Sequence, residues 1–211
     1  MRKKQILETE RLVLRPFRAG DFDDYAALFA DPEVTRYLSR VQWNRDQAWL
    51  NLAFQVGHWK LLGYGMWAAV ERETGAFVGR IGFAEPEGWP GCELAWALAP
   101  RFWGRGYATE GARAALDYAF TVLGKNRVIS LIHPENDASL RVAGRLGETL
   151  QGRTDHTGRE MLIYGIERPE RPLFAMLPQP CSSTTYVPME RAVQSMVKRV
   201  FVRGSEMPVS S

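Results

Sequence analysis

One stretch of the sequence constrains the fold more than any other: an apolar run, a proline, a glycine-containing turn and a helical pattern, in that order. Residues 94–99 (LAWALA) are apolar, Pro100 ends the run, and residues 101–106 (RFWGRG) lead into helical spacing that continues to about Leu123. This order predicts a strand, a turn and a helix. Because the first turn of a helix has unpaired N–H groups and a partial positive charge, it can hold an anion such as phosphate.

Two glycines give the turn its conformational freedom. Neither Gly104 nor Gly106 has a Cβ, so the backbone can come close to a bound anion. Arg101 and Arg105 add side-chain positive charge. Two glycines in a strand-to-helix turn are also common where no ligand binds. The spacing alone therefore leaves two interpretations open, an anion site and an ordinary turn.

The order of residues in and after the turn resembles a family signature. Residues 101–110 (RFWGRGYATE) are similar to the acyl-CoA signature of the Gcn5-related N-acetyltransferase (GNAT) superfamily, and most of all to its Rim-type ribosomal-protein N-terminal acetyltransferase subgroup. Residues 8–15, 93–98 and 133–139 carry the same resemblance in the same order, so that the match spans about residues 7–167. The resemblance implies one α/β domain with a splayed, mixed, mostly antiparallel sheet flanked by helices.

The same resemblance implies where acetyl-CoA binds. Its pyrophosphate would lie on the turn, and its pantetheine arm would lie in the gap between the strand ending at Ala99 and the strand ending at Ile132. The implied contacts with the co-substrate come from Leu98, Arg101, Trp103, Gly104, Arg105, Gly106, Tyr107, Ala108, Thr109 and Asn136.

Composition narrows the class of protein. The chain has 211 residues, of which 45% are hydrophobic and 24% charged, as in an ordinary globular protein. Its 27 basic and 24 acidic residues give a net charge of +3, too balanced to indicate binding of nucleic acid. With no signal-peptide pattern and no apolar run of membrane-spanning length, we expect a cytoplasmic protein without a membrane partner. Cys92 and Cys181 form no metal-type spacing, so no metal is expected.

Periodicity and turn residues predict the order β-α-α-β-β-β-α-β-α-β-β. Asp21 and Asn44 are the expected caps of the first two helices, and Trp49, Leu52 and Val56 lie at helical spacing in the second. The expected strands are residues 11–17, 64–70, 76–84, 92–99, 128–132, 149–153 and 161–166, and the expected helices begin at residues 21, 44, 106 and 137.

The character of the sequence changes after Glu167. Residues 168–172 (RPERP) begin a proline-containing linker, so we expect an acetyltransferase domain at residues 7–167 and a tail at residues 168–211. Residues 189–202 place apolar side chains on one helical face, as in an amphipathic helix. We expect the tail to be loosely attached, the alternative being docking on this chain or on a partner.

Two glutamates are candidates for the general base. Glu93 is a carboxylate in an otherwise apolar strand, where burial would raise its pKa and suit it to accept a proton from an amine. The resembled subgroup often has a glutamate at this place. Glu85 ends the neighbouring strand and is the alternative base. The plain interpretation of Glu93 is a solvated residue at the end of a strand.

Asn136 and Ser139 are the candidates at the start of the second cofactor helix. In the resembled family the asparagine hydrogen-bonds the pantetheine, and in the Rim-type subgroup a serine at this place hydrogen-bonds the departing thiolate. The plain alternatives are a helix cap for Asn136 and a polar residue without a role for Ser139. Many members have a tyrosine acid seven residues after the asparagine, but this chain has Ala143 there.

Other residues are weaker candidates. His133 occupies a position that is structural in the resembled family. Trp89, Trp96 and Trp103 either line the acceptor pocket or pack in the core, and core packing is favoured for Trp96. Tyr164 could reach the site from a late strand.

Two departures from the resembled family follow Asn136. Gly144 lies inside a predicted helix, and Glu148 stands where an apolar residue is usual. Glycine costs about 1 kcal/mol relative to alanine in a helix interior. Together they predict a less tightly packed second cofactor helix.

The resemblance implies an N-acetyltransferase that moves an acetyl group from acetyl-CoA to a primary amine in a ternary complex. The first expected acceptor is a protein N-terminal α-amine, and the alternative is a small-molecule amine or antibiotic. A non-catalytic acyl-CoA-binding module is the rival from another class. The expected partners are acetyl-CoA and the amine, with the protein a monomer or a homodimer.

Overall fold

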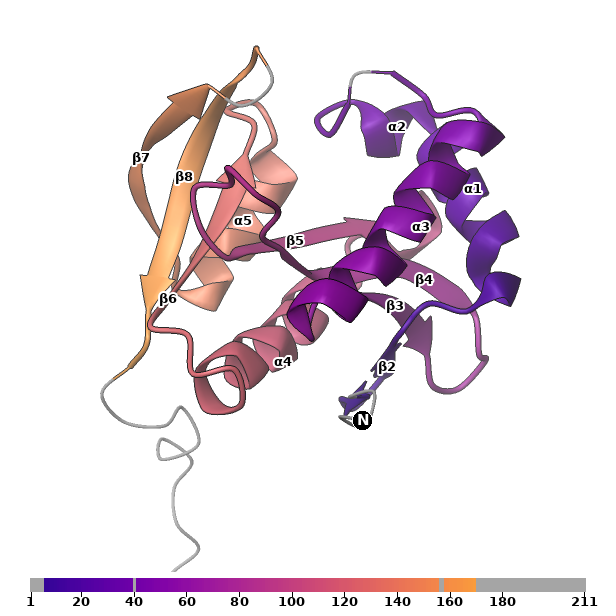
Figure 1. Ribbon diagram of the computed structural model, residues 1–211, viewed down its shortest axis with the longest axis horizontal. Coiled ribbons are helices and arrows are strands. Elements are labelled where there is room, and N and C mark those ends of the chain that lie inside the picture. Colours follow the sequence, from indigo (N-terminus) through magenta and orange to yellow (C-terminus); the bar gives the residue numbers. More distant parts are fainter. Residues whose placement is uncertain (1–5, 40, 156–157, 170–211) are drawn as a thin grey trace, which may run out of the picture. The chain divides into compact units, whose positions relative to one another are not determined.

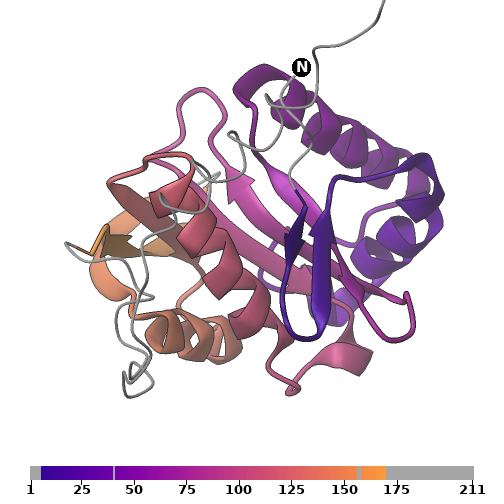
Figure 2. The ribbon, with the colours of Figure 1, turned by 90° about the horizontal axis from the view of Figure 1, so that it is seen from below.

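The computed structural model describes residues 6–39, 41–155 and 158–169. Within these residues a single mixed sheet lies between two layers of helices (Figures 1 and 2). The strands are β1 (Leu7–Glu8), β2 (Leu12–Arg15), β3 (Met66–Glu71), β4 (Phe77–Ala84), β5 (Glu93–Leu98), β6 (Arg127–Ile132), β7 (Thr149–Asp155) and β8 (Glu160–Glu167). The helices are α1 (Phe22–Ala30), α2 (Pro32–Thr35), α3 (Arg45–Leu62), α4 (Tyr107–Thr121) and α5 (Asp137–Leu146), with 3-10 turns at Ala19–Asp21 and Pro100–Phe102.

The sheet has the strand order β1-β2-β3-β4-β5-β6-β8-β7. Neighbouring strands are antiparallel except β5 and β6, which are parallel. Helices α1 and α3 cover one face of the sheet, and α4 and α5 cover the other (Figure 2). The predicted fold class and order of elements are confirmed, and the structure adds the short elements β1 and α2.

Helix α3 begins where the sequence predicted. The side chain of Asn44 accepts a hydrogen bond from the Gln47 N–H, and the Gln47 side chain accepts one from the Asn44 N–H. The predicted cap is therefore confirmed as a reciprocal capping box.

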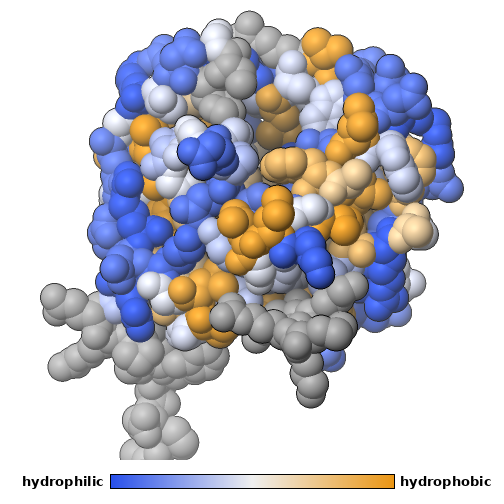
Figure 3. All heavy atoms as spheres, in the orientation of Figure 1, coloured by the Kyte–Doolittle hydropathy of each residue, from blue (hydrophilic) through white to orange (hydrophobic). Residues whose placement is uncertain are grey.

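The buried face of α3 differs from the predicted pattern. Trp49 and Val56 are each 52% exposed, whereas Gln55 and His58 are buried. Burial of His58 is tolerated because both ring nitrogens have partners: Nε2 accepts from the Glu85 N–H at 3.0 Å, and Nδ1 lies 2.8 Å from the Tyr64 carbonyl. Figure 3 shows hydrophobic side chains gathered over this helix, and the exposed ones are Trp49, Leu50, Phe54, Val56, Leu61 and Leu62.

Asp21 stands at the N-cap of α1, but its carboxylate does not cap that helix. It accepts hydrogen bonds from both terminal nitrogens of Arg15, at 2.7 and 2.8 Å, and from the Arg18 N–H at 2.7 Å. The predicted capping bond is therefore wrong, because the arginine at the end of β2 takes the carboxylate instead. The pairing ties β2 to the start of α1.

Two predictions concern residues that the structure does not describe. The amphipathic helix predicted at residues 189–202 and the tail from residue 170 lie outside them. Within the part that the structure describes, every helix is too short or too polar to cross a membrane.

Candidate active site

The predicted strand, turn and helix are confirmed as β5, the segment 99–106 and α4. Gly104 and Gly106 have φ values of 72° and 83°, a left-handed conformation that other residues rarely adopt. Gly106 is the N-cap of α4, and no side chain caps this helix. The N–H groups of its first turn are therefore left for water or a ligand.

Strands β5 and β6 part after a single paired position, Glu93 opposite Ile129. Beyond it, side chains replace the ladder: the Leu131 N–H donates to the Glu93 carboxylate, and the Ser130 hydroxyl donates to the Leu94 carbonyl at 2.8 Å. Because these groups satisfy the backbone, the strands can separate without leaving buried polar groups unpaired. The predicted splay of the sheet is thus confirmed, and Glu93 helps to make it.

A cavity of about 800 Å³ extends from the turn at residues 101–106, the predicted anion turn, to the segment that follows α1. A volume of this size suits a drug-sized or larger ligand. Its walls come from β5 (Trp96, Ala97, Leu98), the turn and α4 (102–110), α5 (Asn136, Ala138, Ser139, Arg141, Val142, Arg145) and the segment 33–38 (Glu33, Val34, Arg36, Tyr37, Leu38).

Nearly all of the predicted cofactor residues meet in this cavity. Those that line it are Leu98, Trp103, Gly104, Arg105, Gly106, Tyr107, Ala108, Thr109 and Asn136, together with Ser139. Arg101 does not: its guanidinium donates to the Phe77 carbonyl at 3.2 Å. The guanidinium of Arg105 points toward Glu71, and its Nη2 lies 3.4 Å from Glu71 Oε1. Both guanidinium groups thus have partners within the protein, and their contact with the co-substrate stays a prediction.

Helix α5 adds positive charge to the cavity, which Arg36 and Arg105 also line. Arg141 and Arg145 lie one helical turn apart and both line the cavity. Within the described residues, neither guanidinium has an ion-pair or hydrogen-bond partner. Unpaired guanidinium groups beside uncapped N–H groups make an anion-binding wall. The spacing of four along a helix that follows Asn136 was the signal that could have identified them.

Glu93 is buried, as predicted, with 8% of its surface exposed. Burial raises the pKa of this carboxyl to about 7, although the indole N–H of Trp89, the charge of Arg80 and the Leu131 N–H each lower it. Trp89 donates to the carboxylate at 2.7 Å. Glu93 is not among the described residues that line the cavity, so its role as base stays a prediction.

Glu85 is less suited to accept a proton. Lys125 Nζ lies 2.6 Å from its carboxylate, and the Tyr64 hydroxyl also donates to it. Burial raises the pKa of Glu85, but the hydrogen bonds from Lys125 and Tyr64 lower it by more, so that it lies below the ordinary value. Between the two candidates, the electrostatics favour Glu93.

Asn136 forms the cap that the plain interpretation predicted. Its side-chain oxygen accepts a hydrogen bond from the Ser139 N–H at 3.1 Å. The cap uses only the amide oxygen, and both residues line the cavity. Capping and contact with a ligand are therefore compatible at Asn136.

The remaining candidates divide between the cavity and the scaffold. His133 Nδ1 accepts from the Glu135 N–H at 3.2 Å, and its ring lies 5.4 Å from the Tyr37 ring, which is a structural role. Trp96 packs against the core yet lines the cavity, and Trp103 lines it while its indole N–H donates to the Leu98 carbonyl. Tyr164 pairs with Ser130 in the β6–β8 ladder and is not among the described residues that line the cavity.

Sequence reasoning missed the wall that faces the turn. The segment 33–38 lines the cavity, and Arg159, just before β8, donates to the carbonyls of Tyr37 and Leu38 at 2.7 and 2.6 Å. These contacts tie the β7–β8 hairpin to the segment after α2. Residues more than a hundred positions apart form them, so local spacing could not have predicted them.

Glu148 is buried rather than loosely packed, with 4% of its surface exposed. Its Oε1 lies 3.1 Å from the Ser130 hydroxyl oxygen, and its Oε2 has no hydrogen-bond partner within the described residues. Ser130 has one hydrogen and cannot donate to both Leu94 and Glu148; because the Leu94 carbonyl, at 2.8 Å, is the nearer acceptor, the contact with Glu148 is a hydrogen bond when protonated Glu148 donates. Burial raises the pKa of Glu148 to about 7, which favours this protonated form.

The parted strands and the uncapped start of α4 are the features that the resemblance to an acyltransferase family led us to expect. Residues 11–149 match the acetyltransferase (GNAT) domain family, and this chain belongs to that family. It is therefore an N-acetyltransferase, and members of the family take the acetyl group from acetyl-CoA. Within the described residues, no group of three or more His, Cys, Asp or Glu side chains is arranged to hold a metal ion.

Known proteins place the chain among these enzymes. The uncharacterized protein YkkB of Bacillus subtilis (strain 168) is 36% identical over 151 residues, which are 70% of this chain and 87% of that protein. Spermidine N(1)-acetyltransferase of Escherichia coli (strain K12) is 32% identical over 71 residues, 34% of this chain and 37% of that protein.

Solved structures share the fold. The acetyltransferase from Agrobacterium tumefaciens str. C58 has a TM-score of 0.71 at 32% identity, covering 77% of this chain and 94% of that one. The ribosomal-protein-S5-alanine acetyltransferase from Vibrio fischeri has a TM-score of 0.64 at 14% identity, covering 79% and 98%. At that identity, the second likeness is one of fold alone.

Proposed function

We propose that this GNAT enzyme transfers the acetyl group of acetyl-CoA directly to a protein N-terminal α-amine. The continuous cavity is the observation that supports direct transfer, because one space joins the anion turn to the segment 33–38. Donor and acceptor can then bind together, without a covalent acetyl-enzyme. The likeness of residues 101–110 to the Rim-type signature supports the choice of acceptor.

In this proposal the donor lies across three elements. The N–H groups at Gly104 and Gly106 hold the pyrophosphate, and Arg141 and Arg145 neutralise phosphate charge. The pantetheine arm follows β5 where it parts from β6, and the amide nitrogen of Asn136 donates to it. The residues named here all line the cavity: Gly104, Gly106, Asn136, Arg141 and Arg145.

Glu93 and Ser139 carry the proposed chemistry. A carboxylate with a pKa of about 7 can accept a proton near neutral pH. Because Glu93 lies outside the cavity wall, we propose that a water molecule relays the proton from the amine. The Ser139 hydroxyl then donates a hydrogen bond to the sulfur as negative charge develops there.

Replacing Gly106 by valine is expected to weaken acetyl-CoA binding by about 10-fold or more, because valine cannot adopt the left-handed backbone that aims the turn at the anion. Calorimetry measures the change. Gly124→Val is the matched control, since Gly124 has a φ of 68° but lies beyond the other end of α4. Equal binding by the Gly106 and Gly124 variants would remove the turn from the donor site.

Ser139→Ala is expected to lower kcat by roughly 10-fold and to leave the KM for acetyl-CoA nearly unchanged, because charge on sulfur appears only as the thioester breaks. Asn136→Ser keeps a good helix cap but loses the amide nitrogen, so it is expected to raise that KM instead. Steady-state kinetics separate the two effects. Small and equal effects in both variants would leave these residues with the capping role alone.

The acceptor is tested by a turnover screen. Peptides with different N-terminal residues are compared with small amines, including spermidine, at one acetyl-CoA concentration. We expect turnover with free α-amino peptides and none with the same peptides blocked at the N-terminus. Turnover of small amines without turnover of any peptide would replace the proposed acceptor by a small-molecule amine.

A further inference from the structure

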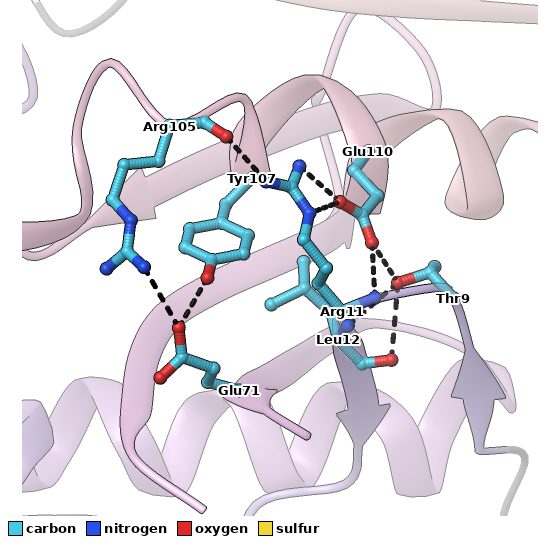
Figure 4. Close-up of polar contacts among 7 residues, drawn as sticks. All are labelled: Thr9, Arg11, Leu12, Glu71, Arg105, Tyr107 and Glu110. Carbon is cyan, nitrogen blue, oxygen red and sulfur yellow. Dashed lines mark hydrogen bonds and ion pairs between the residues drawn. The ribbon is translucent and has the colours of Figure 1, made fainter. Parts of the chain in front are cut away.

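A network of charged side chains lies behind the anion turn and joins it to the N-terminal hairpin of β1 and β2 (Figure 4). Glu110, in the first turn of α4, accepts hydrogen bonds from the Thr9 hydroxyl at 2.6 Å and from the Arg11 N–H at 2.8 Å. It also accepts one from Arg11 Nε at 2.7 Å and forms an ion pair with Arg11 Nη2 at 2.6 Å. The arginine is thereby fixed against the start of α4.

From this position Arg11 holds one backbone atom of the turn. Its Nη1 donates to the Arg105 carbonyl at 2.9 Å, and its guanidinium lies over the Tyr107 ring. The Arg105 carbonyl and the Gly106 N–H belong to one planar trans peptide, so they point in opposite directions. Because Arg11 holds the carbonyl on its own side, the Gly106 N–H faces the other side.

The Gly106 N–H is accordingly expected to face the cavity, because Arg105 and Gly106 line it, whereas Arg11 and Glu71 are not among the described residues that do. Tyr107 and Glu110 of the same network also line it. Glu71 of β3 braces the flanks of the same peptide, because its carboxylate accepts from the Tyr107 hydroxyl and from Arg105 Nη2 (Figure 4). The peptide before α4 is therefore held by Arg11 and its flanks by Glu71, and neither of these two residues is among the described residues that line the cavity.

We propose that Arg11, held by Glu110, is a positioning residue for the donor: it fixes the peptide between Arg105 and Gly106 so that the Gly106 N–H is aimed at the pyrophosphate before acetyl-CoA arrives. This inference rests on the proposed donor site. A donor group that is already oriented binds more tightly, because no rotation of the peptide has to be restrained on binding. Arg11 acts through the backbone and makes no contact with the ligand.

Arg11→Met tests this role, because methionine keeps an aliphatic stem and removes every donor. We expect its acetyl-CoA dissociation constant to rise by about 10-fold, as for the loss of one charge-assisted hydrogen bond that orients the site. Arg72→Met is the matched control. Arg72 Nη1 donates to the Thr9 carbonyl at 2.7 Å, so this arginine supports the same hairpin without touching the turn. Its dissociation constant is expected to stay within about two-fold of wild type.

Two further measurements separate positioning from charge and from general damage. Arg11→Lys keeps the charge, but a single ammonium cannot reach both Glu110 and the Arg105 carbonyl, so it is expected to bind acetyl-CoA as weakly as Arg11→Met. S-acetylpantetheine carries the thioester without any phosphate. Its binding, followed by ligand-observed NMR, is expected to be the same in wild type and in both Arg11 variants.

Three results would overturn the inference: wild-type binding of acetyl-CoA by Arg11→Met, rescue by Arg11→Lys, or an equal loss of affinity for S-acetylpantetheine. Failure of the proposed donor site looks different. In that case wild-type protein itself would bind acetyl-CoA no better than S-acetylpantetheine, and the inference would be lost with it.

Discussion

Glu93→Gln is expected to lower kcat by roughly 100-fold while leaving the affinity for acetyl-CoA nearly intact. Loss of a general base removes a proton acceptor from the transition state, which is typically worth a factor of this size. Glutamine keeps an acceptor oxygen for Trp89 or Leu131, so the start of the strand gap is preserved. Wild-type kcat/KM is expected to fall below about pH 7 as Glu93 becomes protonated, and this acidic limb is expected to disappear in the variant.

Glu148→Gln is the matched control for this experiment. Glu148 is a second buried glutamate with a pKa raised to about 7, but it faces Ser130 and is not among the described residues that line the cavity. Its replacement is expected to keep wild-type kcat and the acidic limb. If Glu93→Gln turned over as fast as Glu148→Gln, proton removal would belong to ordered water or to another group.

The same control variant has a large expected effect on stability. Glu148→Gln is expected to be more stable than wild type by about 3 kcal/mol at pH 8, with a melting temperature higher by roughly 10 °C. The physical reason is the cost of ionising a buried acid, since the pKa of Glu148 rises from an ordinary 4.5 to about 7 on folding. Glutamine stays neutral and its amide N–H can donate to Ser130 in place of the acid proton.

The sign of this effect follows from proton binding. Between about pH 4.5 and pH 7, folded wild type keeps the Glu148 proton that the unfolded chain loses. Stability of wild type therefore falls as the pH rises through this window and levels off above it. The advantage of the variant is expected to be small at pH 4.5 and complete by pH 8, as measured by thermal unfolding across that range.

Glu160→Gln is the background control, because Glu160 lies at the far end of the β7–β8 hairpin from Glu148 and 55% of its side chain is exposed. Its effect is expected to be within about 0.5 kcal/mol. An equal advantage of Glu148→Gln at pH 4.5 and pH 8 would mean that Glu148 binds no extra proton on folding. The hydrogen-bond order from Glu148 through Ser130 to Leu94 would then be wrong.

The sequence predicted what depends on neighbouring residues. Asn44 and its capping partner lie three positions apart, and Gly104 and Gly106 lie inside one turn, so spacing and backbone conformation were enough. The separation of β5 from β6 was predicted only from the family resemblance. Its physical cause, the use of the Glu93 and Ser130 side chains as backbone partners, appears only with both strands in place.

The sequence could not predict the direction of side chains that have distant partners. The Arg101 guanidinium donates to the Phe77 carbonyl, and Arg101 is not among the described residues that line the cavity. Trp49 fits the helical pattern of α3, yet the buried face of this helix carries His58, because the Tyr64 carbonyl and the Glu85 N–H, both outside α3, give its ring nitrogens partners. A single helix pattern carries no information about such partners.

The bond between Thr9 and Glu110 spans 101 positions of the chain. Contacts of this separation are expected to form late in folding, because closing a long loop costs chain entropy before the contact can stabilise the chain. Helix α4 can form early from its own residues, but the peptide at its start takes its orientation only when the N-terminal hairpin arrives. The proposed phosphate-binding turn is thus expected to take its final form in the last stage of folding. Binding of acetyl-CoA is then expected to report on a chain that has finished folding rather than on one with only its helices formed.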